Sequence, residues 1–524
     1  MTVEGKKVAK AAVFIMIAVF IARILGYVRD MVIYSKFGQN YETDAFNAAF
    51  SIPDFIYMLL VGGALSSAFI PVFSSYLATG RREEGWKTAS ILFNFTIVCM
   101  LLLITLAYVY TRPLILLLVP KLPPESINLA VTLTHIMFIQ TFFMALNGLA
   151  MAVLNSYQRF VAPALGGIFY NLGIITGGLW LAERMGIKAF SFGVVLGAVL
   201  NFLVQVPSLI KSRPQYTFSF DWRNSGFREV LVLMLPVVIG LSVTQFNLFI
   251  SQNLASGLGG GVISALKLAQ RIMQLPIGIF AVSIGIAVFP TLTSQVARGE
   301  LASFKKTSSL GIRAVFFITL PSALGLMALR EPLIRLLFEH GNFTAQNTLT
   351  TAWALFYYCL GLFAYSALQV LNRTFYAVKD TVTPVVVGVV TIVLNIVLSI
   401  YLARFWGCRG LALAYSLAGV FNMLLLLGIL WFKVGTIGGR KIMSTFLVSL
   451  GASLVMYAAA RWSAFYLIHT LAFSDKINHL IAVTVGVTLG VGVYGLIALL
   501  LKMEEAQLVL GLIRKRLPAL RGAD

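Results

Sequence analysis

The chain alternates long runs of apolar residues with short polar breaks over its whole length. A helix needs about 20 largely apolar residues to cross a bilayer, and each run is long enough for one span. We count fourteen runs, and no segment between them is long and polar enough to form a soluble domain. The pattern therefore predicts an all-α polytopic membrane protein with 14 transmembrane helices. The predicted spans begin near Val8, Asp44, Trp86, Ile127, Val161, Ile187, Arg228, Val262, Ser308, Gln346, Thr381, Arg409, Lys441 and Ile477.

Composition agrees with this class, because 59% of the 524 residues are hydrophobic and only 11% are charged. Soluble domains carry about 25% charged residues. The first apolar run is too long for a signal peptide and lacks an A-x-A site, so we expect it to remain as helix 1. The three cysteines and four histidines are scattered, and P-loop, H-E-x-x-H and G-x-S-x-G motifs are missing. We therefore expect no enzyme, no cofactor and no metal centre.

The net charge of +21 would favour nucleic acid as a partner in a soluble protein, but here it follows the loops. Loops on the side of the amino terminus carry more than twice as many Lys and Arg residues as loops on the other side. Because basic loops stay in the cytoplasm, both termini are predicted to be cytoplasmic, as an even helix count requires. Most of the excess of Lys and Arg over Asp and Glu therefore reflects membrane topology rather than nucleic-acid binding.

The two halves of the chain match each other at an offset of about 220 residues. The segment Pro71 to Gly80 (PVFSSYLATG) matches Pro290 to Gly299 (PTLTSQVARG). Further along, Pro163, Gly186 and Asn201 match Pro384, Gly407 and Asn422. Chance alignment of apolar helices would not place prolines and glycines in register so consistently. We therefore expect an N-terminal lobe at 1–222 (helices 1 to 6), a C-terminal lobe at 223–436 (helices 7 to 12), and two extra helices with a cytoplasmic amphipathic tail at 437–524.

A repeat of six helices gives both lobes the same orientation in the membrane. Transporters built from such parallel repeats bind substrate between the lobes near the bilayer midplane, and access alternates as the lobes rock. The tail segment Glu504 to Arg516 combines apolar residues with a basic cluster. We expect it to lie on the inner leaflet as a positive-inside anchor.

Helix 1 carries charges where a membrane span should have none. A charged side chain at the bilayer centre costs about 2.5 to 3.5 kcal/mol on insertion scales, so Arg23 and Arg29 indicate a helix that faces a watery cavity. Asp30 lies seven residues after Arg23, nearly on the same face, and the two could neutralise each other. Arg29 points away from Arg23 unless Gly26 allows a bend. The alternative is a buried ion pair between helices, which contributes little stability.

Helix 8 supplies a further cation at Arg271, on the same face as Lys267 but deeper in the span. Lys267 could instead extend its amine to the membrane interface. On helix 2, Asp44 could pair with Arg29 as an outer gate, or it could be a helix N-cap. Several arginines in one cavity favour an anionic head group, because guanidinium pairs bidentately with phosphate.

Six longer stretches resemble one known family. In order they are Ala22 to Asp30 (ARILGYVRD), Thr43 to Pro53 (TDAFNAAFSIP), Ala64 to Phe73 (ALSSAFIPVF), Leu275 to Leu292 (LPIGIFAVSIGIAVFPTL), Glu331 to Thr344 (EPLIRLLFEHGNFT) and Asn372 to Pro384 (NRTFYAVKDTVTP). Together they resemble the MurJ (MviN) lipid II flippase family of the MOP exporter superfamily. That family also has fourteen helices in two lobes plus an extra pair.

The resemblance implies that Arg23, Arg29 and Arg271 contact the pyrophosphate of the substrate and that Asp44 is a functional acid. It also implies that helices 13 and 14 form a groove for the polyprenyl tail. The chain departs from some members where they have further basic residues, since it has Ser51 and Tyr57 there. Members with a sodium site use acids on helices 7 and 11, where this chain has Ser251 and Ser399, although Asn395 remains, so the sequence leaves sodium coupling open.

The leading hypothesis is thus a lipid II flippase that acts by alternating access in peptidoglycan biosynthesis, in the bacterial cytoplasmic membrane. Its expected partners are lipid II and membrane lipids, while contacts with cell-wall synthesis proteins are left open. The alternative substrate is another polyprenyl-pyrophosphate-linked saccharide, of O-antigen or teichoic acid type. A multidrug exporter would need acids in the cavity. A glycosyltransferase would need carboxylates in a large outer loop, which the pattern does not contain.

Overall fold

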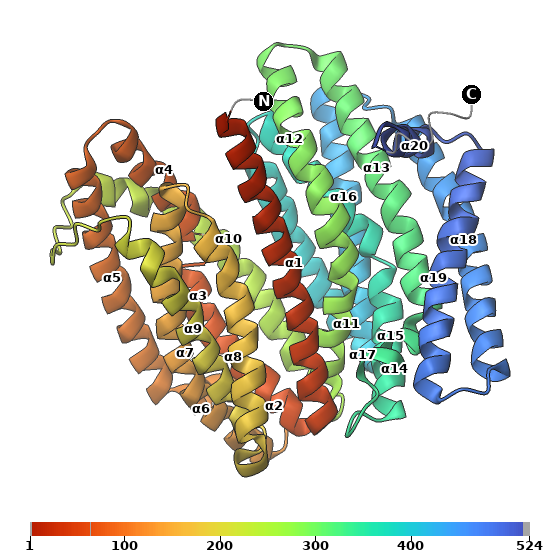
Figure 1. Ribbon diagram of the computed structural model, residues 1–524, viewed down its shortest axis with the longest axis horizontal. Coiled ribbons are helices and arrows are strands. Elements are labelled where there is room, and N and C mark those ends of the chain that lie inside the picture. Colours follow the sequence, from red (N-terminus) through yellow and green to blue (C-terminus); the bar gives the residue numbers. More distant parts are fainter. Residues whose placement is uncertain (1–2, 63, 517–524) are drawn as a thin grey trace. The chain divides into compact units, whose positions relative to one another are not determined.

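The computed structural model describes residues 3–62 and 64–516, and all regular structure within these ranges is helical. The chain divides into two compact units (Figure 1). Unit 1 comprises Met1–Ser264 together with the short segment His340–Phe343, and unit 2 comprises Ala265–Glu339 and Thr344–Asp524. The two units are therefore described separately.

Unit 1 contains ten complete helices and the first turn of an eleventh. They are α1 (Val3–Phe37), α2 (Tyr41–Ala49), α3 (Ser51–Leu60), α4 (Ala64–Ala78), α5 (Arg82–Val109), α6 (Thr111–Leu118), α7 (Pro124–Ser156), α8 (Val161–Met185), α9 (Lys188–Ile210), α10 (Ser225–Ala255) and the start of α11 (Val262–Pro276).

Unit 2 contains the rest of α11, one π-helical turn and nine further helices. They are η1 (Ile277–Ala281), α12 (Val282–Ala297), α13 (Leu301–Ala328), α14 (Arg330–Phe338), α15 (Ala345–Cys359), α16 (Leu362–Ala377), α17 (Val382–Val434), α18 (Gly439–Thr470), α19 (Asp475–Leu500) and α20 (Glu504–Arg516).

The polytopic membrane class predicted from the sequence is confirmed. Within the described ranges, nine helices are long and apolar enough to cross a membrane, or ten if the bent pair α15 and α16 is one span. The elements follow the order of the predicted spans, and α17 covers two of them, because Gly407 interrupts it with φ 54° and ψ −129°. The count of fourteen spans stays a prediction.

The second predicted span is not one continuous helix, because it is divided into α2, α3 and α4. Pro53 explains the first break. Proline has no N–H, so the carbonyl of Ala49 loses the hydrogen bond that a continuous helix would supply. The Thr134 hydroxyl of α7 lies 3.4 Å from that carbonyl oxygen, but its nearer acceptor is the carbonyl of Ala130 at 2.8 Å.

Backbone conformation recurs at the repeat offset. Gly186, between α8 and α9, has φ 58° and ψ −142°, close to the values of Gly407 inside α17. Likewise Gly80 and Gly299, which end the two matched segments, have φ 75° and 72°. These angles are accessible mainly to glycine. Equivalent chain reversals at matched positions support the internal repeat.

The division between units falls one helix after the lobe boundary expected from the repeat. α10 begins at Ser225, beyond the expected end of the N-terminal lobe, yet it packs against α3, α4 and α5 of unit 1. Packing and sequence repetition are different relations, since a helix can belong to one repeat by sequence and contact the other. The lobes at 1–222 and 223–436 therefore stay a prediction.

The closest helix packing in unit 1 joins α8 and α9. A Cβ added to Gly173 would lie 2.4 Å from the Cα of Gly197, and one added to Gly177 would lie 2.9 Å from the Cα of Gly193. Small residues let helix backbones approach in a membrane, where dispersion contacts rather than the hydrophobic effect drive association. α1 packs against α8 of this closely packed pair.

Candidate substrate site

The Arg29 side chain forms an ion pair with its neighbour Asp30 on α1. The Nε and Nη2 atoms of Arg29 lie 3.0 and 2.8 Å from Oδ1 of Asp30, and the two side chains are 17% and 11% exposed. The pair offsets part of the cost of holding a cation inside a membrane span. The structure therefore pairs Asp30 with Arg29 rather than with Arg23, the partner suggested by helical spacing.

Arg23 lies on an exposed part of α1. The side of α1 that packs on α8 includes Ala22, whose carbonyl accepts a hydrogen bond from Asn171 Nδ2 at 3.2 Å, and the buried Gly26. α1 continues through Gly26 as one helix. The helix thus presents Arg23 away from its packing face, and the hinge role of Gly26 stays a prediction.

Asp44 is fully buried and receives three hydrogen bonds from the start of α11. Its Oδ2 accepts from the N–H of Gly261 at 2.7 Å, and its Oδ1 accepts from the N–H and the hydroxyl of Ser264 at 2.8 and 2.7 Å. The first N–H groups of a helix have no partner within the helix. Asp44 therefore caps a helix that lies about 220 positions later in the chain.

A second polar side chain of α2 extends this contact. Asn47 donates from Nδ2 to the hydroxyl of Ser264 at 2.9 Å and to the hydroxyl of Tyr34 at 3.3 Å. Ser51, at the start of α3, donates to Oε1 of Gln252 at 2.7 Å. These buried bonds hold the broken second span against α1, α10 and the first turn of α11.

Arg271 lies on α11 in unit 2, where it is half-buried. Lys267 and Gln274 occur on the same side of the helix, at spacings of four and three residues, and both are exposed. The opposite side, which includes Leu268 and Ile272, is buried. α11 is thus an amphipathic helix in an otherwise apolar span, as expected for a helix that lines a watery space.

The structure brings together some of the predicted residues within one unit. Arg23, Gly26, Arg29 and Asp30 share α1, and Asp44 belongs to the same unit. Arg271 belongs to the other unit, so its relation to the arginines of α1 stays a prediction. The sequence analysis missed Asn47 and Gln274. Asn47 could have been found from its position one helical turn after Asp44. Gln274 could have been found from the i, i+4, i+7 spacing of polar residues along α11.

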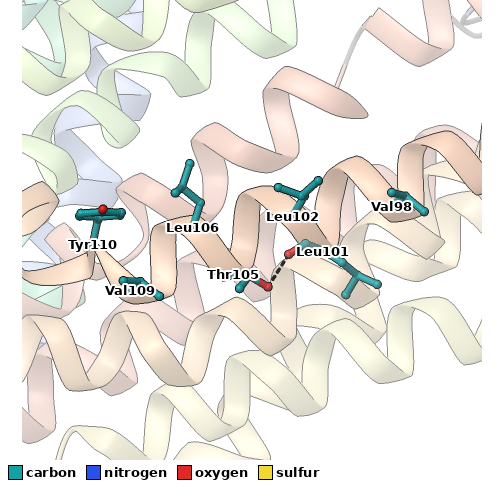
Figure 2. A pocket seen from close by; sticks show the side chains of 7 residues that line it. All are labelled: Val98, Leu101, Leu102, Thr105, Leu106, Val109 and Tyr110. Atoms are coloured by element: carbon teal, nitrogen blue, oxygen red, sulfur yellow. Dashed lines mark hydrogen bonds between the residues drawn. The ribbon is translucent and has the colours of Figure 1, made fainter.

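A separate hollow of about 500 Å³ lies along α5 in unit 1 (Figure 2). All seven lining residues come from this one helix: Val98, Leu101, Leu102, Thr105, Leu106, Val109 and Tyr110. The hydroxyl of Thr105 is already bonded to the carbonyl of Leu101 at 2.8 Å. This hollow has no charged lining residue and does not include any of the predicted site residues. Within residues 3–62 and 64–516, no group of three His, Cys, Asp or Glu side chains could hold a metal ion.

Comparison with protein families identifies the family of this chain. The profile described as lipid II flippase MurJ matches residues 33–474. The chain belongs to the MurJ family. Its charged membrane helices therefore occur in a family of lipid flippases, and the multi-pass inner-membrane location follows from the family and the apolar helices.

Individual members of the MurJ family agree over most of their length. A probable lipid II flippase MurJ of Buchnera aphidicola subsp. Acyrthosiphon pisum is 31% identical over 421 residues, which covers 80% of this chain and 82% of the relative. The lipid II flippase MurJ of Burkholderia cenocepacia is 30% identical over 458 residues, which covers 85% and 88%.

Solved structures show the same fold. A lipid II flippase MurJ in an inward closed conformation has a TM-score of 0.79 at 30% identity and covers 93% of this chain and 99% of that chain. An inward-facing MATE multidrug transporter of the MOP superfamily has a TM-score of 0.63 at 16% identity and covers 81% and 95%. The MATE structure shares the fold, while the MurJ relatives share the family.

Proposed function

We propose that this protein carries lipid II, the lipid-linked peptidoglycan precursor, from the inner to the outer leaflet of the cytoplasmic membrane by alternating access. The observation that carries this proposal is the membership in the MurJ family, whose curated relatives are named lipid II flippases. Cations placed within membrane helices support it, because lipid II bears a pyrophosphate. Guanidinium groups bind phosphate oxygens with two parallel hydrogen bonds.

In this proposal Arg23, Arg29 and Arg271 bind the pyrophosphate. The pairing of Arg29 with Asp30 uses its Nε and Nη2 atoms, so Nη1 is the atom that reaches the substrate. Asp30 serves as a positioning residue, because it fixes the plane of the guanidinium. Gly26 serves as the hinge at which α1 bends, since glycine lowers the cost of departing from helical geometry.

Asp44 is proposed to close the outer gate. Its hydrogen bonds to Gly261 and Ser264 tie α2 to the start of α11. When the outer side opens, these bonds break and the carboxylate gains water. Such a contact exists in one of the two access states only, and it therefore biases the equilibrium between them.

The larger assembly follows from the repeat. We propose that the lobes at 1–222 and 223–436 rock against each other, and that α18 and α19 hold the polyprenyl tail. The distribution of basic loops supports a cytoplasmic position for both termini. Because lipid II is consumed on the outer leaflet, we also propose cell-wall synthesis proteins as partners.

The test is transport of fluorescent lipid II in proteoliposomes that contain the full chain. Arg29→Ala and Arg271→Ala should each lower the initial rate at low substrate by about tenfold or more, since each removes a charge-assisted hydrogen bond to phosphate. Asp30→Asn should also lower the rate, and Arg29→Lys should restore only part of it.

Arg184→Ala is the matched control, because Arg184 is an exposed cation at the end of α8. Its transport should equal that of the unchanged protein. Normal transport by folded Arg29→Ala and Arg271→Ala variants would contradict the residue assignments. Absence of lipid II transport by the unchanged protein, with transport of another polyprenyl-pyrophosphate saccharide instead, would contradict the substrate.

A further inference from the structure

A cavity of about 290 Å³ lies within unit 2, at the end of the α18 and α19 pair that is remote from α20. Its walls come from α14 and α15 on one side and from α18 and α19 on the other. The polar lining includes Arg335, Arg461, His469 and His479. None of these side chains has a role in the transport mechanism proposed above.

Two of the charged lining residues are already neutralised. Arg335 Nε donates to Oε2 of Glu339 at 3.1 Å, and the same carboxylate accepts from the hydroxyl of Thr348 at 2.5 Å. The carboxylate of Glu331 lies 3.3 Å from Arg330. These pairs compensate the charges of Arg335 and Glu331. The net charge of the cavity therefore depends on its other polar side chains.

Arg461 is the cation that lacks a carboxylate. Its Nη1 lies 3.5 Å from the carbonyl oxygen of Ala328 at the end of α13, which is a weak contact. Among residues 3–62 and 64–516, no carboxylate lies within ion-pair distance of Arg461. A cation within a membrane span without an anion is costly unless a ligand or water satisfies it.

His479 is a second polar residue in the lining. It is 3% exposed, and its Nδ1 lies 2.6 Å from the carbonyl oxygen of Asp475. A carbonyl accepts only, so Nδ1 carries a proton. The ring has Nε2 as its other polar atom, and a carboxylate oxygen of Asp475 also lies 3.4 Å from Nδ1.

The part of α18 that lines the cavity also carries exposed aromatic side chains. Trp462, Phe465 and Tyr466 of α18 are 68%, 61% and 55% exposed, and the rings of Trp462 and Tyr466 stack with centroids 5.8 Å apart. Exposed Trp and Tyr side chains gather at the depth of lipid head groups. Leu349 and Phe465 give the cavity apolar walls beside its cationic groups.

We propose that this cavity binds the phosphodiester head group of a membrane lipid, with Arg461 on the phosphate oxygens and Leu349 and Phe465 against the adjoining chains. Pockets for drug-sized ligands measure roughly 300–1,000 Å³, so this cavity admits a small head group but not the saccharide and peptide of lipid II. The cavity is lined by none of the three arginines proposed to bind the pyrophosphate.

Native mass spectrometry of the full, delipidated chain tests the proposal. Short-chain phosphatidylglycerol is titrated into the detergent solution, and the dissociation constant of the first retained lipid is measured. Arg461→Gln should raise that constant about tenfold, which corresponds to the loss of about 1.4 kcal/mol. Leu349→Trp should also raise it, because the larger ring fills the cavity without changing the charge.

Arg404→Gln is the matched control, since Arg404 is an exposed cation of the same unit and does not line the cavity. It should bind the lipid as the unchanged protein does. If Arg461→Gln fails to fold, Arg461→Lys retains the charge and should show a smaller loss. Equal effects of Arg404→Gln and Arg461→Gln would overturn the proposal, and so would unchanged binding by Leu349→Trp.

A second titration separates a lipid from free phosphate. Inorganic phosphate at millimolar concentration should fail to displace phosphatidylglycerol, because it makes no contact with the apolar walls. Displacement by inorganic phosphate at the concentration of the lipid would overturn the assignment to a lipid head group. Retention of the lipid supports it.

Discussion

Asp44 of α2 is hydrogen-bonded to Ser264 of α11. The N–H and the hydroxyl of Ser264 donate to Oδ1 of Asp44 at 2.8 and 2.7 Å, across 220 positions of sequence. The carboxylate is fully buried. Its charge faces the N-terminus of α11, where the helix dipole and the free N–H groups favour an anion.

Removing either partner should weaken this contact. Asp44→Asn should lower the free energy of unfolding by about 1.5 to 3 kcal/mol, because it replaces charge-assisted bonds with neutral ones, and Ser264→Ala by about 1 kcal/mol. The double variant should lose less than the sum, since Asp44→Asn weakens the same hydroxyl bond that Ser264→Ala removes. Unfolding in detergent measures the loss of stability in all three variants.

Ser283→Ala is the control, because it removes an exposed hydroxyl that is bonded to the carbonyl of Ile279. It should change the stability little. Additive losses would contradict the coupling.

The buried ion pair between α13 and α20 should stabilise the tail helix. Arg313 lies 2.5 Å from Glu505, and their side chains are 8% and 4% exposed, whereas Glu504 is 60% exposed. Glu505→Gln should cost about 3 to 5 kcal/mol, because it leaves a buried cation with an incomplete partner. Glu504→Gln should cost less than about 1 kcal/mol, because exposed pairs are screened by solvent.

Hydrogen exchange of α20 and the unfolding midpoint measure these effects. Glu504→Gln serves as the matched control, since it removes the same charge one residue earlier. Equal losses in the two variants would show that burial does not set the strength of this contact.

The stability should fall in acid through Asp380. Burial alone would raise the pKa of Asp380, but the Lys433 amine and the hydroxyl and N–H of Thr383 bond its carboxylate and lower the pKa from 3.8 to about 2. A group with a lowered pKa stabilises the fold above its unfolded value, and this stabilisation is lost as pH falls toward the folded value. The loss should therefore occur between about pH 4 and pH 2.

The measurement is the unfolding midpoint as a function of pH for the unchanged protein and for Asp380→Asn. The difference between the two should be constant above about pH 5 and should shrink as the pH falls, because the asparagine cannot titrate. Parallel curves down to pH 2 would contradict the assignment to Asp380.

The glycines at matched positions should respond alike to substitution. A Cβ at Gly186 or Gly407 would meet no atom within 4 Å, so Gly186→Ala and Gly407→Ala test backbone strain alone. Each should lower the free energy of unfolding by about 1 to 3 kcal/mol, because the φ and ψ angles at both positions are strained for alanine.

Gly388→Ala is the control. It also has open space, but its φ is helical, so alanine should stabilise by about 0.5 to 1 kcal/mol. A stabilising Gly407→Ala would contradict the argument.

Much of the fold could be predicted because a membrane restricts the backbone structures that a chain can adopt. Backbone polar groups must be satisfied within each span, so apolar runs become helices. The predicted starts at Val161 and Val262 coincide with the first residues of α8 and α11. The breaks of the second span were not predicted, although Pro53 was visible, because proline in a membrane helix can also be accommodated by a kink.

For the site, the sequence by itself determined which residues are unusual, namely Arg23, Arg29, Arg271 and Asp44, since charges in apolar runs are visible without coordinates. Only the tertiary structure decided their partners. Arg29 pairs with its neighbour Asp30, and Asp44 bonds a helix start 220 positions away. Periodicity reports which face of one helix a residue occupies, whereas a hydrogen bond depends on side-chain rotamers and on helices brought together by packing. Long-range pairing of this kind is set by the assembled fold.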